Sequence, residues 1–406
     1  MDDSDLGAGT RLAAAGRRAE WTGTPAHPGA VVAPPVWRAS THLYPNMAAL
    51  RAHPANVDGN FYYGRRGSPT QWALADALTG LEPGAAGTVL YPSGVSAIAG
   101  ALLTVLRPGD VLLMTDNAYE PSRAMARGLL TDMGIETRWF DPLQPEAMAG
   151  AICERTRAVL LENPGSLTFE MADIPALAAL ARARGVVSVM DNTWAGPLGF
   201  APLTHGVDIT VMSLTKHVGG HSDAMMGSAS AGAEWYARLR QRSQQLGIVV
   251  SPDDAALMLR GLRTMDLRLK RSAQTALALA EFLSTRGEIA HVLCPMLPGA
   301  PGHAIWRRDF AGACGLFGFV FRGGTGAARD AAIDALHHFG IGYSWGGFES
   351  LATPVDPASI RSATPWPPAR WDKADRFGVR LAVGLEDAAD LIADLDRAIT
   401  AWKAAQ

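Results

Sequence analysis

Short apolar runs alternate with helical patterns between residues 68 and 230, and this alternation most constrains the fold. The runs carry few polar residues, as is typical of strands covered on both faces. They are Val111–Thr115, Thr137–Phe140, Ala158–Leu161, Val186–Met190 and Ile209–Met212. One helix between them has clear ends, because Asp173 suits the N-cap, Pro175 the first turn and Gly185 the stop. Strands that alternate with helices predict an α/β domain with a mostly parallel sheet.

The chain on either side of this alternation has a different character. Residues 1–65 contain prolines such as Pro25, Pro28 and Pro54, together with several aromatic residues. We expect this stretch to be a loop-rich arm that packs on something else, such as another subunit. We therefore predict three parts: this arm, a cofactor-binding α/β domain over residues 66–254, and a smaller domain over residues 255–406.

The C-terminal part combines strand and helix patterns, which predicts an α+β domain. Gly315–Phe321 and Val379–Val383 are predicted strands, and Asp330–Phe339 is a predicted helix. The last segment places apolar residues at helical spacing and predicts a closing amphipathic helix. Those residues are Leu391, Ile392, Leu395, Ile399 and Trp402.

Charge and cysteine content exclude several classes of protein. The chain has 36 Lys and Arg against 39 Asp and Glu, a net charge of 36 − 39 = −3, with no basic face for nucleic acid. Its three cysteines are sparse and widely spaced, which indicates neither a disulfide framework nor a metal site. No apolar run is long enough to span a membrane, and the start, Met1–Asp5, is not typical of a signal peptide. We expect a cytoplasmic protein without a metal.

Polar side chains follow four of the predicted strands. In open α/β sheets, ligands bind outside the carboxyl ends of the strands. A single cluster could be no more than a helix cap, but four together predict one site. The clusters are Asp116–Asn117, Glu162–Ser166, Asp191–Trp194 and Ser213–His217.

Three of these positions suggest specific chemistry, each with an ordinary alternative. Lys216 at the rim of a buried sheet would be partly desolvated, which favours a nucleophilic amine, although surface lysines are common. Asp191 follows an apolar run and needs a cation, either on a cofactor or on an arginine, unless it caps a helix. Ser93–Ser96 opens a helix with small residues, which suits an anion but also suits close helix packing.

In combination, these pieces resemble the Cys/Met-metabolism family of pyridoxal phosphate (PLP) enzymes. The shared pieces occur in the family's order and cover nearly the whole chain. They are Tyr63–Arg65, Ser93–Val95, Ala118–Tyr119, Asp191–Trp194 and Ser213–Lys216. Longer strings are most similar to the bacterial carbon–sulfur β-lyases within the family. These strings are Phe61–Gly67, Ala118–Ser122, Gly220–Met225, Tyr343–Gly347 and Gly384–Asp387.

The resemblance implies the aspartate-aminotransferase-like (type I) fold and a role for each matching residue. Lys216 would bind PLP covalently and act as the base, Asp191 would pair with the ring nitrogen, and Tyr119 would stack on the ring. The phosphate would be held by Gly94, Val95, Ser213 and Thr215, and by Tyr63 and Arg65 of a neighbouring subunit. The substrate would be bound by Arg380, Ser344, Trp345, Tyr343 and Arg66. Shared sites of this kind imply a homotetramer built from dimers.

The implied reaction is α,β-elimination on L-cystathionine or a related S-substituted L-cysteine, which gives a thiol (homocysteine), pyruvate and ammonia. The chain departs from the acidic residues of such enzymes at Ala124 and Gln241, so the S-substituent stays open, and Arg123 would add a cation beside the site. Ser166 replaces an Asn of γ-cleaving relatives, which favours β-cleavage.

Three other functions remain as alternatives. The first is a γ-lyase or γ-replacement enzyme acting on cystathionine, methionine or an activated homoserine. The second is a silent, non-catalytic subunit, which the presence of Lys216, Asp191 and Tyr119 disfavours. The third is a nicotinamide dehydrogenase, which the missing Gly-x-Gly-x-x-Gly pattern disfavours.

Overall fold

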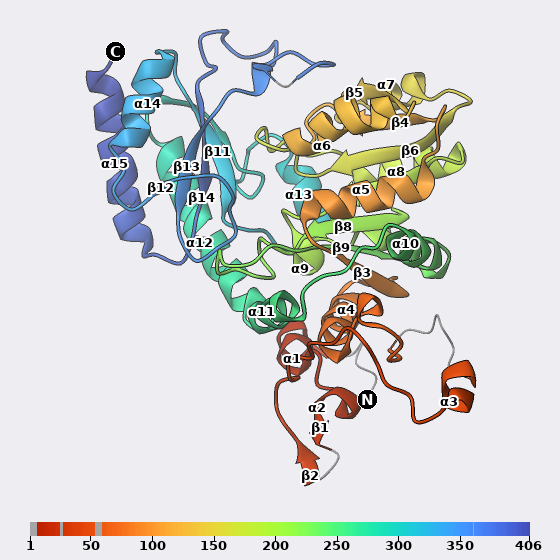
Figure 1. The fold of residues 1–406 in the computed structure, drawn as a ribbon. Helices are drawn as coiled ribbons and strands as arrows, with labels where there is room; N and C mark the ends of the chain where they lie inside the picture. The colour runs from red at the N-terminus through yellow and green to blue at the C-terminus, as the bar shows by residue number, and fades with distance from the viewer. Residues whose placement is uncertain (1–5, 25–26, 53–58, 360) are drawn as a thin grey trace. The chain divides into compact units, whose positions relative to one another are not determined.

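The computed structural model describes residues 6–24, 27–52, 59–359 and 361–406. The chain forms two compact units (Figure 1). The first unit consists of residues 1–104 and 208–266, and the second of residues 105–207 and 267–406. The three-part division expected from the sequence stays a prediction.

The first unit begins with short elements separated by irregular chain. They are α1 (Ala8–Ala14), α2 (Ala19–Thr22), β1 (Gly23–Thr24), β2 (His27–Ala30), α3 (Met47–Ala52) and the 3-10 turn η2 (Gly64–Arg66). This stretch is thus loop-rich, although it contains more helix than its prolines suggest. Two of the prolines that led to this expectation, Pro25 and Pro54, lie outside the described residues.

The rest of the first unit places helices around three strands. The helices are α4 (Pro69–Leu81), α5 (Gly94–Val105), α10 (Ala233–Gln245) and α11 (Pro252–Leu262), and the strands are β3 (Gly87–Tyr91), β8 (Ile209–Ser213) and β9 (Gly227–Ala231). Strand β9 pairs antiparallel with both β3 and β8. The sequence pattern missed β9, because Gly-Ser-Ala-Ser-Ala lacks the β-branched and aromatic residues typical of strands.

The second unit begins with four parallel strands in the order β7-β6-β4-β5. They are β4 (Val111–Thr115), β5 (Glu136–Phe140), β6 (Thr156–Glu162) and β7 (Val187–Asp191). The bounds of these strands match the predicted runs to within two residues. The apolar runs predicted buried strands, and every residue of β4 and most residues of β6 are buried.

A helix or helical turn follows each of these strands, as in an α/β domain. They are α6 (Glu120–Met125), the π-turn η3 (Ala126–Leu130), α7 (Pro145–Ala151), α8 (Ile174–Ala183), α9 (Gly196–Gly199) and the 3-10 turn η4 (Pro202–His205). The predicted ends of α8 are confirmed. The Asp173 carboxylate accepts a hydrogen bond from the Ala176 N–H at 3.0 Å, and Gly185 has a φ of 64°.

A second sheet in the same unit has the order β10-β11-β14-β13-β12. Its strands are β10 (Ile289–Leu293), β11 (Leu316–Phe321), β12 (Gly340–Ile341), β13 (Leu351–Val355) and β14 (Gly378–Ala382). The pairings are antiparallel except for β12 with β13. The remaining elements are α12 (Met265–Ser284), α13 (His303–Asp309), α14 (Gly326–Asp334), the 3-10 turn η5 (Pro357–Ser359) and α15 (Ala388–Ala404).

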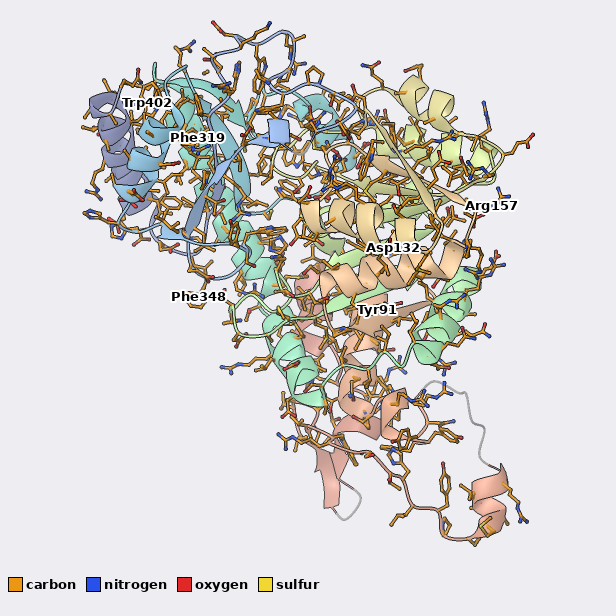
Figure 2. All side chains as sticks on the ribbon, turned by 45° about the horizontal axis from the view of Figure 1, so that its top comes forward. Tyr91, Asp132, Arg157, Phe319, Phe348 and Trp402 are labelled. Carbon is orange, nitrogen blue, oxygen red and sulfur yellow. The ribbon has the colours of Figure 1, made fainter. Side chains whose placement is uncertain are left out.

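Aromatic and aliphatic side chains of β11, α12, α14 and α15 form one hydrophobic core. Phe319 and Trp402, which Figure 2 labels, both belong to it. The Trp402 ring stacks on the Phe321 ring with 4.8 Å between their centres. The predicted closing helix is confirmed as α15, because Leu391, Leu395, Ile399 and Trp402 are all buried.

Helix α14 was misplaced by the sequence pattern. It begins at Gly326, with the Thr325 hydroxyl accepting from the Ala328 N–H at 3.1 Å, and it ends at Asp334 rather than Phe339. The N–H groups of His337, His338 and Phe339 instead bind the buried carboxylate of Asp394. A tertiary contact thus stops this helix.

Among the helices of the described residues, none combines the length and the apolar character that crossing a membrane requires.

Candidate active site

Two acidic residues lie side by side at the carboxyl ends of β6 and β7 in the second unit. Glu162 ends β6 and Asp191 ends β7, and the parallel register pairs them directly. The Asp191 carboxylate accepts hydrogen bonds from the N–H of Thr193 at 2.9 Å and from its hydroxyl. The polar clusters that follow these strands therefore meet at one sheet edge, as expected of a parallel sheet.

Burial and the nearby charge of Asp191 raise the pKa of Glu162 well above its ordinary value. Two carboxylates this close together cannot both ionise cheaply in a desolvated site. The Tyr119 backbone N–H donates to Glu162 Oε2 at 2.6 Å. Glu162 therefore connects Tyr119, which is expected to stack on the cofactor ring, with Asp191, which is expected to pair with the ring nitrogen.

The Tyr119 side chain lies at the same edge, and 41% of its surface is exposed. Burial of its hydroxyl, and then the charges of Glu162 and Asp191, raise the pKa of Tyr119, whereas Arg380 lowers it. These four side chains of the second unit therefore share one electrostatic environment.

Arg380 reaches this environment from β14 in the middle of the second sheet. Its guanidinium donates to the carbonyl oxygen of Ser344 at 2.9 Å, and burial lowers its pKa. Ser344 has a φ of 79°, which is unusual for a residue other than glycine. Tyr343, next to it, is 91% exposed. A buried guanidinium beside a strained loop can bind a carboxylate in a bidentate manner.

A buried ionic network lies directly after β4. Asp116 accepts hydrogen bonds from the backbone N–H groups of Ser362 at 2.8 Å and Thr364 at 2.9 Å, and from Arg361 Nε at 2.9 Å. Burial alone would raise the pKa of Asp116, but these hydrogen bonds outweigh it and hold the pKa well below its usual range. The network fixes the turn that leads into Tyr119.

The expectation that Arg123 adds a cation beside the site is wrong. Only 1% of its surface is exposed, and it pairs with Asp116 at 3.4 Å. Its guanidinium also lies 4.0 Å from the centre of the Trp139 ring. The positive charge of Arg123 is therefore paired with Asp116 inside the protein. Sequence reasoning missed Arg361, because no local pattern marks an arginine that pairs with Asp116, 245 positions away.

Lys216 lies in the first unit, in a tight turn directly after β8. Its backbone N–H donates to the Ser213 carbonyl at 3.3 Å, and its carbonyl accepts from the Gly220 N–H at 2.8 Å. Thr215 anchors the turn, since its hydroxyl accepts from the Met226 N–H at 3.1 Å. The half-buried lysine is therefore carried by a rigid turn rather than by a flexible loop.

The same unit builds a narrow cradle around the start of α5. A Cβ atom on Gly94 would lie 2.7 Å from the Cβ of Ser213, and one on Gly227 would lie 2.3 Å from the Ser93 carbonyl oxygen. Glycine alone permits these approaches. The first N–H groups of a helix, here those of Gly94 and Val95, have no partner inside the helix and suit an anion such as a phosphate.

Tyr63 and Arg65 lie near the surface of the first unit. Tyr63 is 43% exposed, and the Arg65 guanidinium lies 6.0 Å from the centre of its ring. Arg65 also donates to the Gln244 carbonyl at 3.4 Å. Such exposure is compatible with contact to a second chain, which the structure does not contain.

These residues are of the kinds that PLP enzymes use, namely a lysine, a carboxylate, an aromatic ring and a glycine-lined helix start. The family model of the Cys/Met metabolism PLP-dependent enzymes matches residues 21–400. The chain therefore belongs to this family of PLP-dependent enzymes, and the expected cofactor is confirmed.

Several individual relatives are similar over nearly their whole length. The cystathionine β-lyase of Escherichia coli K12 is 39% identical over 367 residues, which cover 89% of this chain and 91% of that protein. The cystathionine β-lyase of Bordetella avium is also 39% identical, with 90% and 91% covered.

A solved structure supports the fold. The cystathionine γ-synthase of Xanthomonas oryzae, in complex with aminoacrylate and cysteine, superposes with a TM-score of 0.86 at 31% identity. The match covers 99% of this chain and 100% of the other. The predicted fold, with a mostly parallel central sheet and a smaller C-terminal sheet, is confirmed.

Proposed function

We propose that this protein is a carbon–sulfur β-lyase that cleaves L-cystathionine, or a closely related S-substituted L-cysteine, to homocysteine or another thiol, pyruvate and ammonia. The observation that carries the proposal is the 39% identity, over about nine-tenths of the chain, to enzymes named cystathionine β-lyase. Lys216, Asp191 and Tyr119 are residue types that this chemistry uses, which supports the proposal.

The surroundings of each residue support the cofactor roles that we propose. Lys216 would bind PLP covalently, Asp191 would pair with the ring nitrogen, and Tyr119 would stack on the ring. Gly94, Val95, Ser213 and Thr215 would hold the phosphate. Burial and the charge of Asp191 raise the pKa of Glu162, which favours a single negative charge, on Asp191, for the ring nitrogen.

Bound PLP supplies an electron sink that stabilises negative charge at the substrate Cα. The Lys216 amine would take the Cα proton as a general base. The Cβ–S bond then breaks, the electron pair leaves with sulfur, and the thiolate takes up a proton. Water hydrolyses the remaining three-carbon fragment to pyruvate and ammonia.

We assign substrate orientation to Arg380 and its neighbours. Its guanidinium binds the substrate α-carboxylate, with Ser344 beside it and Tyr343 and Trp345 along the wall. Arg66 contacts the far end of the substrate. A fixed carboxylate holds the Cα–H bond toward the base, which is how positioning lowers the barrier.

A product screen tests the proposal. The holoenzyme is incubated with cystathionine, cystine, S-alkylcysteines and methionine, and pyruvate and 2-oxobutyrate are measured separately. We expect pyruvate from cystathionine, because β-cleavage leaves a three-carbon acid. If 2-oxobutyrate were the main product, the proposal would be wrong.

The likeness to the Xanthomonas cystathionine γ-synthase favours one alternative, a γ-lyase or γ-replacement enzyme. The same screen separates the two reactions, because γ-cleavage yields the four-carbon acid. An activated homoserine with cysteine as second substrate covers the replacement reaction.

We also propose a homotetramer built from dimers that share active sites, located in the cytoplasm. The exposed Tyr63 and Arg65 support the sharing, and three free cysteines are compatible with a reducing compartment. Light scattering of the purified protein measures the assembly directly.

A further inference from the structure

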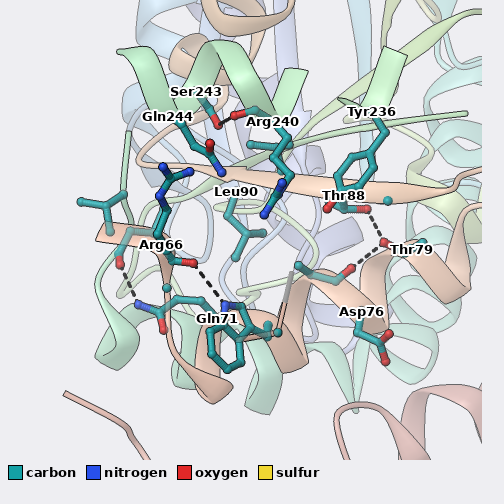
Figure 3. Close-up of a pocket in the computed structure, with 18 of the residues that line it drawn as sticks. Arg66, Gln71, Asp76, Thr79, Thr88, Leu90, Tyr236, Arg240, Ser243 and Gln244 are labelled. Atoms are coloured by element: carbon teal, nitrogen blue, oxygen red, sulfur yellow. Dashed lines mark hydrogen bonds between the residues drawn. The ribbon is translucent and has the colours of Figure 1, made fainter. Parts of the chain in front are cut away.

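A cavity of about 350 Å³ in the first unit lies between η2, α4, β3 and α10 (Figure 3). Arg65 and Arg66 line it, and we assign them to the cofactor phosphate and to the substrate. This cavity therefore adds no separate binding site. The second unit offers a different feature, the buried side chain of Arg361.

Arg361 bridges two carboxylates that belong to different loops of the second unit. Its Nε atom donates to Asp116 at 2.9 Å, and its Nη1 atom donates to Glu170 at 2.8 Å. Asp116 begins the turn that follows β4, and Glu170 lies in the loop that follows β6. Only 3% of the Arg361 side chain is exposed. Because β4 and β6 are neighbouring parallel strands, Arg361 joins two loops at the same edge of the sheet.

The two loops are also in direct contact beside this bridge. The Asn117 side chain donates from Nδ2 to Glu170 at 3.1 Å, and the Asn117 carbonyl accepts from the Ser166 N–H at 2.8 Å. A Cβ atom on Gly165 would lie 1.9 Å from the same Nδ2 atom, so a larger residue would push the loops apart. The position of Asn117 therefore depends on the loop that holds Glu170.

The turn after β4 leads directly to Tyr119, to which we assign stacking on the cofactor ring. The Tyr119 N–H donates to Glu162 Oε2 at 2.6 Å, and Glu162 ends β6. Tyr119 is thus held against the strand whose following loop Arg361 contacts. A shift between the two loops would move Tyr119 relative to the acidic pair of Glu162 and Asp191.

Loss of this guanidinium would affect the two carboxylates differently. Glu170 is 17% exposed, so its charge would turn toward solvent, where an ionised group is more stable than in a desolvated site. Asn117 would then lose its hydrogen-bond partner. Asp116 would keep the N–H groups of Ser362 and Thr364. The change should therefore loosen the two loops without unfolding the unit.

We propose that Arg361 is a positioning residue for the reaction, because it holds the turn that carries Tyr119 against the loop that follows β6. The bridge uses two nitrogens of one guanidinium, one for each carboxylate, which is a geometry that arginine provides. This inference rests on the role that we propose for Tyr119 in the β-lyase reaction.

The test compares Arg361→Gln with the wild type, both loaded with PLP. Hydrogen exchange, followed by mass spectrometry, should be about tenfold faster in the peptides that contain Tyr119 and Ser166, and unchanged in those of α15. For pyruvate release from cystathionine, kcat should be about tenfold lower and KM should stay within about threefold. A change in KM alone is not expected, because Arg380, which we assign to the substrate carboxylate, keeps its contacts.

Glu170→Gln releases the same bridge from its other end and should reproduce both effects, so it carries the test if Arg361→Gln does not fold. The double variant should lose no more than about twice as much kcat as either single variant, because one bridge is removed in each case. Arg286→Gln is the matched control. Arg286 also pairs with two carboxylates of the second unit, Glu288 at 3.9 Å and Asp396 at 2.7 Å, and its loss should leave exchange around the site and kcat unchanged.

Three results would overturn the positioning role: wild-type exchange around Tyr119 in Arg361→Gln, an unchanged kcat, or multiplied losses of kcat in the double variant. A wild-type enzyme that releases no pyruvate from cystathionine would overturn the proposed function instead. The exchange around Tyr119 would then still decide the role of Arg361, because it does not depend on turnover.

Discussion

Single side chains decide the chemistry, and Lys216 is the clearest case. Lys216→Ala should bind the cofactor only non-covalently and lose turnover by several orders of magnitude, because the tether and the base are removed together. Visible absorbance of the purified protein and pyruvate release measure the two losses. Lys403→Ala, which removes a surface ion pair with Glu288, should keep both properties. Near-normal turnover in Lys216→Ala would contradict the assigned base.

The raised pKa of Glu162 leads to a second prediction about a single residue. Glu162 has a higher pKa in the folded protein than in the unfolded chain, so the folded protein keeps this proton to a higher pH. Glu162 therefore lowers the free energy of unfolding as pH rises above about 4.5, where the unfolded chain loses the proton. Glu162→Gln keeps a carbonyl acceptor for the Tyr119 N–H without the charge. In the cofactor-free protein, the variant should gain stability relative to the wild type between pH 5 and pH 8, by up to about 1.4 kcal/mol per pH unit. Urea unfolding at both pH values measures this, and an equal difference at both would contradict a neutral Glu162.

At the scale of elements, the end of α14 depends on one distant carboxylate. Asp394 is fully buried and accepts from the N–H groups of His337 at 2.8 Å and His338 at 2.7 Å. Asp394→Ala leaves several buried donors unpaired and should lower the free energy of unfolding by about 2–4 kcal/mol. Asp396→Ala on the same helix removes only a surface pair with Arg286 and should cost less than about 1 kcal/mol. Denaturant unfolding of both variants compares them, and similar losses would rule out this capping role.

At the scale of the whole molecule, mixing two inactive variants tests whether two chains share an active site. If Arg65 binds the cofactor of the neighbouring chain, Arg65→Ala damages the neighbour's site, whereas Lys216→Ala damages the site of its own chain. After subunit exchange, half of the dimers should be mixed and each should hold one intact site, so activity should recover to about a quarter of the wild type. Pyruvate release before and after mixing measures the recovery. No recovery, with exchange verified by mass spectrometry, would place Arg65 in its own chain's site.

The sequence by itself determined the elements whose signals are local. The apolar runs located β4 to β8, Asp173 and Gly185 marked the ends of α8, and the residues that follow the strands marked the site. Only the tertiary structure decided the rest. Strand β9 has no apolar signal and exists because β3 and β8 flank it, and α14 stops where Asp394 binds the next N–H groups. Arg123 lies inside the protein, where it contacts Asp116 and Trp139, and Arg361 neutralises the same Asp116 from 245 positions away. Local patterns report what a residue prefers, whereas partners far along the chain decide where a buried charge can be neutralised.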